Sequence, residues 1–325
     1  MLLREGLSFD DVLLSPQHGH LRKREAADLT TELFRGHLLG IPIVSAPMDS
    51  VTESEMAVAM SIAGGFGIIH RFMTVDEQVA QFGIRPQPFT NKGAALGVNE
   101  GYERFDRLYD AGVRVFCVDI AHAHHETVAD FLSNMPKRDD ARIIAGNVAT
   151  NSGARFLCEL GVHAVKVGIG PGAACSTRLV TGFGVPQLTA INEVSWIVRD
   201  SFSHVRIIAD GGIKNSGDIV KALAAGADTV MLGRLLAGAD ESPHPGLYWG
   251  MASHRVNSHH APEGIEGSVP RTGTLRETLK PLLWGLRSGI SYGGGSTIKE
   301  LRENAEFIRV SSLASIESGT RLHHG

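Results

Sequence analysis

Short apolar runs recur along the chain and alternate with stretches of helical periodicity. The runs are continuously apolar, which is typical of parallel strands buried on both faces. The segments between them repeat apolar residues every three or four positions, and one of these predicts a helix capped by Ser216 and stopped by Gly226. The predicted strands are Ile41–Ala46, Phe66–His70, Ala94–Val98, Val113–Asp119, Arg142–Asn147, Ala164–Gly168, Arg206–Asp210 and Thr229–Gly233.

Eight strand–helix units in 325 residues predict an α/β fold of the (β/α)₈ TIM-barrel type. A doubly wound open sheet is the alternative, and it is disfavoured by the number of units and by the lack of Gly-x-Gly-x-x-Gly after the first strand. In such a barrel the active site lies at the carboxyl ends of the strands. Polar residues do gather there: Met48–Ser50, His70–Arg71, Asp119 to His125, Gly146–Asn147, the loop 168–178, Asp210–Gly212 and Gly233–Arg234.

The segment after the eighth strand, about 239–273, is rich in Gly, Pro and His and lacks apolar periodicity. A loop of this length inside a compact domain is usually functional or disordered. Glu263 and Glu266 are each followed by a glycine, which indicates a mobile flap that closes over a ligand. The alternative is a pair of exposed loop charges. Amphipathic helices and a last strand-like piece follow.

Bulk composition narrows the class of protein. A hydrophobic fraction of 43% and a charged fraction of 20% are those of a soluble globular chain. A net charge of -4 disfavours a nucleic-acid partner, and no apolar run approaches the length of a membrane span. Three scattered cysteines do not make a disulfide framework. The sequence therefore predicts a cytoplasmic protein with reduced thiols.

The loop Gly168–Arg178, "GIGPGAACSTR", places a thiol in a glycine-rich polar turn. It fits neither a dinucleotide fingerprint nor a Walker loop. A free cysteine is most often a small buried residue, and this is the interpretation for Cys117 and Cys158. Polar neighbours, Arg178 and backbone N–H groups favour a thiolate at Cys175, which predicts a nucleophile.

Glycines at positions 211, 212 and 233 follow the last two strands, where many barrels bind phosphate with backbone N–H groups. Turn geometry is the alternative explanation for them. Asp210 suits a ribose diol, or else it caps the next turn. His122, His124 and His125 resemble metal ligands, but they lack a carboxylate in register and a Cys partner, so a metal site is disfavoured.

Several ordered blocks together resemble the IMP dehydrogenase/GMP reductase family, from about Leu7 to Ser312. These blocks are "LSFDDVLLSPQ", "SAPMDSVTE", "GGFGIIHR", "IIAGNVAT", "VGIGPGAACSTRLVTGFGVPQLTAI", "IIADGGIKNSGDIVKALAAGADTVMLG", "PEGIEG" and "AEFIRVS". The resemblance implies that Cys175 attacks C2 of a purine 5′-nucleotide and forms a covalent thioimidate. It also implies a homotetramer.

The same resemblance implies a set of binding residues. Gly170 and Gly172, with the Cys175 carbonyl, match a monovalent-cation (K⁺) loop, and NADPH is the expected cofactor. The implied cofactor-binding residues are Asp119, His122, Asn147 and Gly168. The implied substrate-binding residues are Met48, Asp210, Gly211, Gly212, Gly233, Arg234, Tyr248, Met251 and Ala252.

Two features favour the reductase branch. Only a short connector, Gln78 to Gly93, stands where dehydrogenases of the family usually carry two regulatory modules, so a single catalytic domain over 1–325 is expected. The flap sequence "GMASHRVNSHHAPEG" also lacks the Arg-Tyr pair that dehydrogenases use for hydrolysis. Thr177 and Glu263 match the pair that protonates the leaving amine in reductases. The predicted activity is therefore NADPH-dependent reductive deamination of GMP to IMP and ammonia.

Three departures keep alternatives open. Ala173 replaces a serine that helps to hold phosphate, Arg234 stands where Ser or Gly is usual, and "SAPMDSVTE" is closer to the dehydrogenase side. Arg234 is expected to compensate through a charge-assisted contact to phosphate. The alternatives are a deazaguanine-type nucleotide as substrate, an IMP dehydrogenase without the regulatory insert, and a non-catalytic nucleotide sensor, which Cys175, Thr177 and Glu263 together disfavour.

Overall fold

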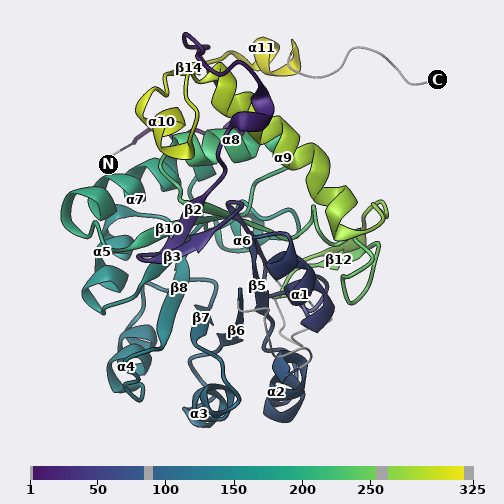
Figure 1. The fold of residues 1–325 in the computed structure, drawn as a ribbon. Helices are drawn as coiled ribbons and strands as arrows, with labels where there is room; N and C mark the ends of the chain where they lie inside the picture. Colours follow the sequence, from purple (N-terminus) through teal and green to yellow (C-terminus); the bar gives the residue numbers. More distant parts are fainter. Residues whose placement is uncertain (1–2, 84–90, 254–262, 318–325) are drawn as a thin grey trace.

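Eight parallel strands close into a barrel in the computed structural model, which describes residues 3–83, 91–253 and 263–317 (Figure 1). Going round the barrel, the order is β10-β11-β4-β5-β6-β7-β8-β9. The predicted barrel is confirmed, and each strand lies within one or two residues of a predicted apolar run. The strands are β4 (Ile43–Ser45), β5 (Phe66–Ile69), β6 (Lys92–Leu96), β7 (Val115–Asp119), β8 (Arg142–Val148), β9 (Ala164–Val167), β10 (Arg206–Asp210) and β11 (Thr229–Leu232).

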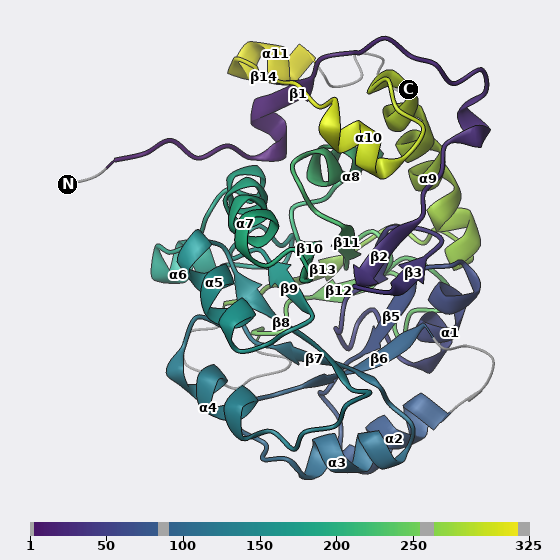
Figure 2. The same cartoon turned by 60° about the vertical axis from the view of Figure 1, so that its left-hand side comes forward.

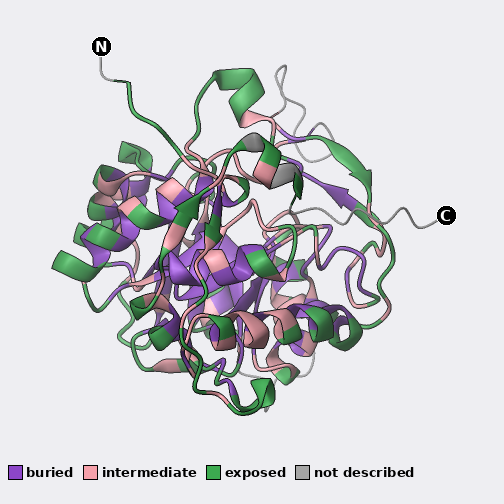
Figure 3. Ribbon diagram, turned by 90° about the horizontal axis from the view of Figure 1, so that it is seen from above, coloured by how far each residue is buried: buried purple, intermediate pink, exposed green. Residues whose placement is uncertain are grey.

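Helices surround the strands, with buried faces turned inward and exposed faces outward (Figure 3). The cap of α8 differs from the prediction by one residue, because the Asn215 side chain, rather than Ser216, accepts the N–H of Asp218. Gly226 follows this helix at φ +123°, a conformation that favours glycine. The helices are α1 (Ser54–Ile62), α2 (Val75–Gly83), α3 (Glu103–Asp110), α4 (Glu126–Asn134), α5 (Asn151–Glu159), α6 (Thr177–Thr181), α7 (Gln187–Ser201), α8 (Ser216–Ala224), α9 (Leu275–Tyr292), α10 (Ile298–Glu303) and α11 (Ser312–Glu317).

The core has two layers. The larger layer lies between the strands and the helices, and the smaller one fills the inside of the barrel with side chains such as Phe66, Ile144 and Met231. A hairpin of β2 (Thr31–Phe34) and β3 (His37–Leu39) adds its apolar residues to the inner layer. None of the helices in the described segments has the length and apolar character of a membrane span.

Two short strands, one near each end of the described chain, pair with each other. A short 3₁₀ helix, η1 (Phe9–Asp11), leads into β1 (Val12–Leu14), which pairs antiparallel with β14 (Phe307–Arg309) (Figure 2). The strand-like piece near the C-terminus is therefore confirmed as a strand. The sequence pattern did not predict its partner β1, because three residues are too few to show a period.

The segment after the eighth strand contains an antiparallel pair, β12 (Leu247–Trp249) and β13 (Glu266–Ser268). The sequence predicted a flap without apolar periodicity here, and the pair is too short to produce one. Residues 254–262 of the predicted flap lie outside the described residues. The adjoining part of the segment crosses the glycine loop, where Gly264 forms an isolated antiparallel bridge with Cys175.

Candidate active site

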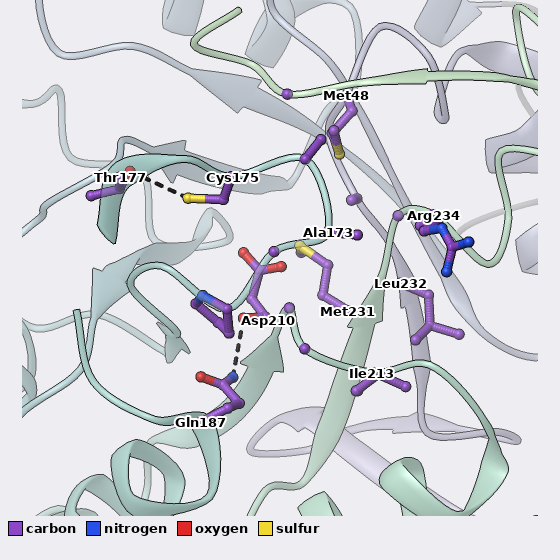
Figure 4. A pocket seen from close by; sticks show the side chains of 18 of the residues that line it. Met48, Ala173, Cys175, Thr177, Gln187, Asp210, Ile213, Met231, Leu232 and Arg234 are labelled. Carbon is purple, nitrogen blue, oxygen red and sulfur yellow. Dashed lines mark hydrogen bonds between the residues drawn. The ribbon is translucent and has the colours of Figure 1, made fainter. Parts of the chain in front are cut away.

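A cavity of about 610 Å³ opens at the carboxyl ends of the barrel strands (Figure 4). Its walls come from the loops after β4, β9, β10 and β11, from η1 and from the segment that carries β12. The structure therefore brings together every residue that the sequence assigned to catalysis or substrate binding. These are Met48, Cys175, Thr177, Asp210, Gly211, Gly212, Gly233, Arg234, Tyr248, Met251, Ala252 and Glu263.

Cys175, Thr177 and Glu263 form a hydrogen-bonded chain at one side of this cavity. The Cys175 Sγ donates to Thr177 Oγ1 at 3.2 Å, and the Thr177 hydroxyl donates to Glu263 Oε2 at 2.6 Å. Cys175 is exposed, whereas Cys117 and Cys158 are buried as predicted. Burial raises the pKa of the Cys158 thiol to about 12, so this side chain stays a neutral thiol. Of the three cysteines, Cys175 is the exposed one, and it lines the cavity.

Backbone pairing explains how Glu263 reaches a thiol 88 positions earlier in the chain. The N–H of Ser176 donates to the Glu263 carbonyl at 2.8 Å, and the N–H of Ile265 donates to the Ala174 carbonyl at 3.0 Å. Gly250, which follows β12, packs against the loop that carries Cys175. A Cβ at Gly250 would come within 2.5 Å of the Ala174 carbonyl oxygen. These contacts fix the carboxylate beside the hydroxyl.

The glycine loop itself is shaped by Arg178. Gly170 has a φ of +87°, and a Cβ there would lie 2.6 Å from the Arg178 Cγ. The guanidinium donates to the Val185 carbonyl at 2.9 Å rather than to the thiol. The Gly172 carbonyl accepts the Cys175 N–H at 3.0 Å, so one of the three carbonyls expected to bind K⁺ also bonds within the loop. The cation site stays a prediction.

The residues expected to bind phosphate lie on the loops after β10 and β11, which line the cavity. Gly211 and Gly212 have φ values of +89° and +80°, which favour glycine. A Cβ at Gly233 would lie 3.0 Å from the Tyr248 hydroxyl oxygen, so a larger residue would crowd this side chain. The Arg234 side chain is exposed at the cavity and makes no ion pair with the described residues (Figure 4).

A cluster of polar side chains surrounds the buried Lys166 and includes Asp210. The Lys166 ammonium is 2.7 Å from Asp119 Oδ1 and 2.7 Å from Asp210 Oδ2, and it also donates to Asn147 Oδ1. Burial opposes its charge, but the two carboxylates outweigh burial and hold the pKa of Lys166 above its usual range. Sequence reasoning assigned Asp119 and Asn147 to the cofactor and missed Lys166, although a lysine inside an apolar strand requires buried partners.

Gln187 is a second residue that the sequence analysis missed. It lines the cavity, is 2% exposed, and donates to the carbonyls of Val167 and Asp210 at 2.8 and 3.0 Å. Gly168 packs against Asp210 and Gln187. A Cβ at Gly168 would be 2.0 Å from the Asp210 carbonyl oxygen and 3.0 Å from Gln187 Oε1. Gln187 begins α7 and looks like an ordinary polar helix terminus, so the sequence carried no signal for it.

A second cavity of about 450 Å³ adjoins the first and shares Ala121, Thr177 and Glu263 with it. Its other walls are mainly apolar and include His122 and His124. Burial and the neighbouring histidines lower the pKa of His122, so this ring is neutral at pH 7. Of the residues assigned to the cofactor, His122 lines this cavity, whereas Asp119, Asn147 and Gly168 lie outside the lining of both cavities.

His125 accepts the backbone N–H of Thr127 and caps α4. Within the described ranges, no group of three or more His, Cys, Asp or Glu side chains could hold a metal ion.

Comparison with known proteins gives consistent matches over almost the whole chain. The model of the family described as "IMP dehydrogenase / GMP reductase domain" matches residues 6–321. An inosine-5′-monophosphate dehydrogenase of Nitrosopumilus maritimus is 34% identical, with 98% of each chain covered. One from Cryptosporidium parvum is 36% identical, covering 97% of this chain and 94% of its own. A GMP reductase of Leishmania major is 33% identical, covering 98% of this chain and 97% of its own.

Proposed function

The chain belongs to the IMP dehydrogenase/GMP reductase family, and from that premise we propose that it is a GMP reductase that converts GMP to IMP and ammonia with NADPH. The observation that carries the proposal is the hydrogen-bonded chain from Cys175 through Thr177 to Glu263. A thiol, a hydroxyl and a carboxylate joined by hydrogen bonds can pass the thiol proton to the carboxylate. The carboxylate can then return that proton through the hydroxyl to a substrate amine.

The direction of the hydrogen bonds suits activation of the thiol. The Cys175 S–H points to the Thr177 oxygen, and the Thr177 O–H points to the Glu263 carboxylate. Transfer of one proton along this chain leaves a thiolate at Cys175 and a neutral Glu263. The thiolate then adds to C2 of the purine ring, which forms the S–C2 bond and moves the electron pair of the C2–N3 double bond onto N3.

The same proton then serves the leaving group. Glu263 returns it through Thr177 to the 2-amino group, the electron pair on N3 re-forms the C2–N3 double bond, and the bond from C2 to the amino nitrogen breaks. Ammonia departs while the S–C2 bond remains. A reduced nicotinamide supplies the hydride that replaces sulfur at C2. The S–C2 bond breaks with its electron pair on sulfur, so Cys175 leaves as a thiolate, and one proton from solvent restores the starting thiol. No water has to be activated, so the cycle needs no base for hydrolysis.

The second cavity supports a nicotinamide cofactor. It meets the nucleotide cavity at Thr177 and Glu263, so a ring held there would adjoin the nucleotide cavity at these two residues. Its mainly apolar walls suit a flat heteroaromatic ring and exclude water from it. His122, Ile169 and Phe183 are among the residues that would hold the cofactor. No step above depends on a monovalent cation.

IMP dehydrogenase activity is the second candidate, because most of the relatives compared, including the two dehydrogenases above, carry that name. In that reaction the hydride leaves C2 first and water then releases the nucleotide from Cys175. The Thr177–Glu263 pair would have to activate this water. The described part of the chain holds no arginine hydrogen-bonded to a tyrosine side chain at the cavity that could take this role.

One assay separates the candidates. The protein is incubated with GMP and NADPH, and in parallel with IMP and NAD⁺, while cofactor absorbance, ammonia and the nucleotide product are followed. We expect NADPH consumption with equal amounts of IMP and ammonia. IMP oxidation without GMP reduction would establish the dehydrogenase instead. Reduction of a deazaguanine nucleotide but not GMP would change the substrate, and nucleotide binding without turnover would indicate a sensor.

A further inference from the structure

Lys166 is a buried charged residue that the mechanism above does not use. Its side chain is 3% exposed and lies on β9 inside the barrel. An ammonium group has three N–H donors, and three side chains accept them: Asp119, Asn147 and Asp210. Asp119 and Asn147 line neither cavity, whereas Asp210 lines the nucleotide cavity. The cluster therefore connects the buried ammonium group of Lys166 to a half-buried carboxylate that lines the nucleotide cavity.

The two oxygens of Asp210 have different environments. Oδ2 accepts from the Lys166 ammonium at 2.7 Å and from Asn147 Nδ2 at 3.0 Å. Oδ1 accepts no hydrogen bond from the described residues. Asn147 is itself held by the Gly168 carbonyl, to which it donates at 2.6 Å. Lys166 and Asn147 thus hold the Asp210 carboxylate through Oδ2, and Oδ1 remains able to accept a hydrogen bond from a ligand.

The barrel is shaped to admit the lysine. Gly146 on β8 lies opposite Lys166 in the parallel register, and a Cβ at Gly146 would come within 2.4 Å of the Lys166 Cβ. A buried charge is costly unless it is fully paired. An apolar side chain of similar length, such as Met, would fill the same space without the desolvation cost of a charge. Packing alone therefore does not explain why a lysine occupies position 166.

We propose that Lys166 is a positioning residue for nucleotide recognition, which holds the Asp210 carboxylate so that Oδ1 accepts a hydrogen bond from the ribose diol. This inference rests on the proposed function, because it requires a ribonucleotide in the cavity. Asp119 and Asn147 complete the support by fixing the ammonium. Selectivity for ribose over 2′-deoxyribose therefore depends on a side chain that the nucleotide does not touch.

The test compares GMP with 2′-deoxy-GMP by isothermal titration calorimetry, for wild type, K166M, D210N and K92M. Lys92 is the matched control, because it is also a buried lysine on a barrel strand, but it donates to the Phe82 carbonyl away from the cavity. We expect wild type and K92M to prefer the ribonucleotide by about tenfold or more, as loss of one charge-assisted hydrogen bond implies. In D210N and K166M that preference falls to about twofold or less.

K166M leaves the carboxylates of Asp119 and Asp210 without the ammonium group between them, so this variant could unfold through their repulsion. A double variant controls for that effect. K166M/D119N keeps the net charge of the cluster, and it is also expected to lose the ribose preference while far-ultraviolet circular dichroism remains native. An undiminished preference in either folded variant overturns the inference, as does failure of both variants to fold, which would make Lys166 a stability residue. Absence of GMP binding to wild type overturns the proposed function itself, and the role of Lys166 with it.

Discussion

Cys175 differs from the other two cysteines in exposure, and this difference makes the nucleophile testable by itself. We expect Cys175→Ser to abolish turnover and to leave nucleotide binding almost unchanged, because an alcohol at neutral pH lacks the nucleophilicity of a thiolate. Activity and GMP affinity are measured on the same preparation. Cys117→Ser is the control, and it should lower only stability, by about 1–3 kcal/mol, because it buries a hydroxyl.

Alkylation gives an independent check of the same assignment. Iodoacetamide should label Cys175 first, and inactivation should follow that labelling in mass spectrometry. Inactivation that follows the labelling of Cys117 or Cys158 instead would mean that the nucleophile is misassigned.

Glu263 is expected to act in the chemical step. Glu263→Gln keeps the shape of the side chain but removes its ability to accept the proton from Thr177. We expect kcat to fall by about 10²–10⁴-fold with little change in KM for the nucleotide. Glu266→Gln is the matched control, since Glu266 is exposed on β13 three positions later. Similar kcat values for the two variants would contradict the proton-transfer role.

Arg234 is predicted to hold the 5′-phosphate in place of the serine that Ala173 replaces. Its guanidinium offers several donors and keeps its charge at all working pH values. Arg234→Ser should cost roughly 1.5–3 kcal/mol, or about one to two decades in affinity for the nucleotide. KM for GMP should therefore rise strongly, with a smaller effect on the chemical step.

Guanosine provides the control for this variant, because it lacks the phosphate and its poor use should scarcely change. Arg155→Ser, which removes an exposed arginine from α5, should leave both substrates unaffected. Equal losses for GMP and guanosine would show that Arg234 acts on something other than phosphate.

At the scale of elements, the eight barrel strands could be predicted because each is a continuous apolar run. In a barrel of parallel strands, the residues that follow each strand lie at the same rim. This rule predicted from the sequence that Asp210, Cys175 and Gly233 lie close together. Lys166 was missed because it lies within a strand, where the pattern was interpreted as core. The pairing of Glu263 with the Cys175 loop came from family resemblance, because no local pattern links residues so far apart.

The contact between the glycine loop and the segment carrying β12 and β13 can be tested through a glycine. Gly250→Ala places a Cβ within 2.5 Å of the Ala174 carbonyl oxygen, so the segment must shift away from the loop. We expect kcat to fall as Glu263 moves from Thr177, while the melting temperature changes little because the barrel core is not involved. Gly267→Ala on β13 is the control, since a Cβ there meets no atom within 4 Å. Equal activity in the two variants would contradict this coupling.

At the scale of the whole molecule, we expect a homotetramer, as the family resemblance implies. Several large apolar side chains are exposed, among them Leu179, Phe183 and Trp196. Single surface apolar residues are ordinary, so assembly must be measured. Sedimentation at assay concentration should give a tetramer, and an active monomer under the same conditions would contradict the expectation.

The antiparallel pairing of β1 with β14 has a consequence for synthesis of the chain. Ser8, Phe9 and Asp10 line the nucleotide cavity, and β1, which follows them directly, is held by a strand at residues 307–309. During synthesis, the barrel strands, Cys175 and Glu263 therefore leave the ribosome before β14, the strand that holds β1 and the adjoining cavity wall in place. We expect a nascent chain to bind nucleotide only after residues 307–309 have left the ribosome, and ligand supplied before that point should not assist its folding.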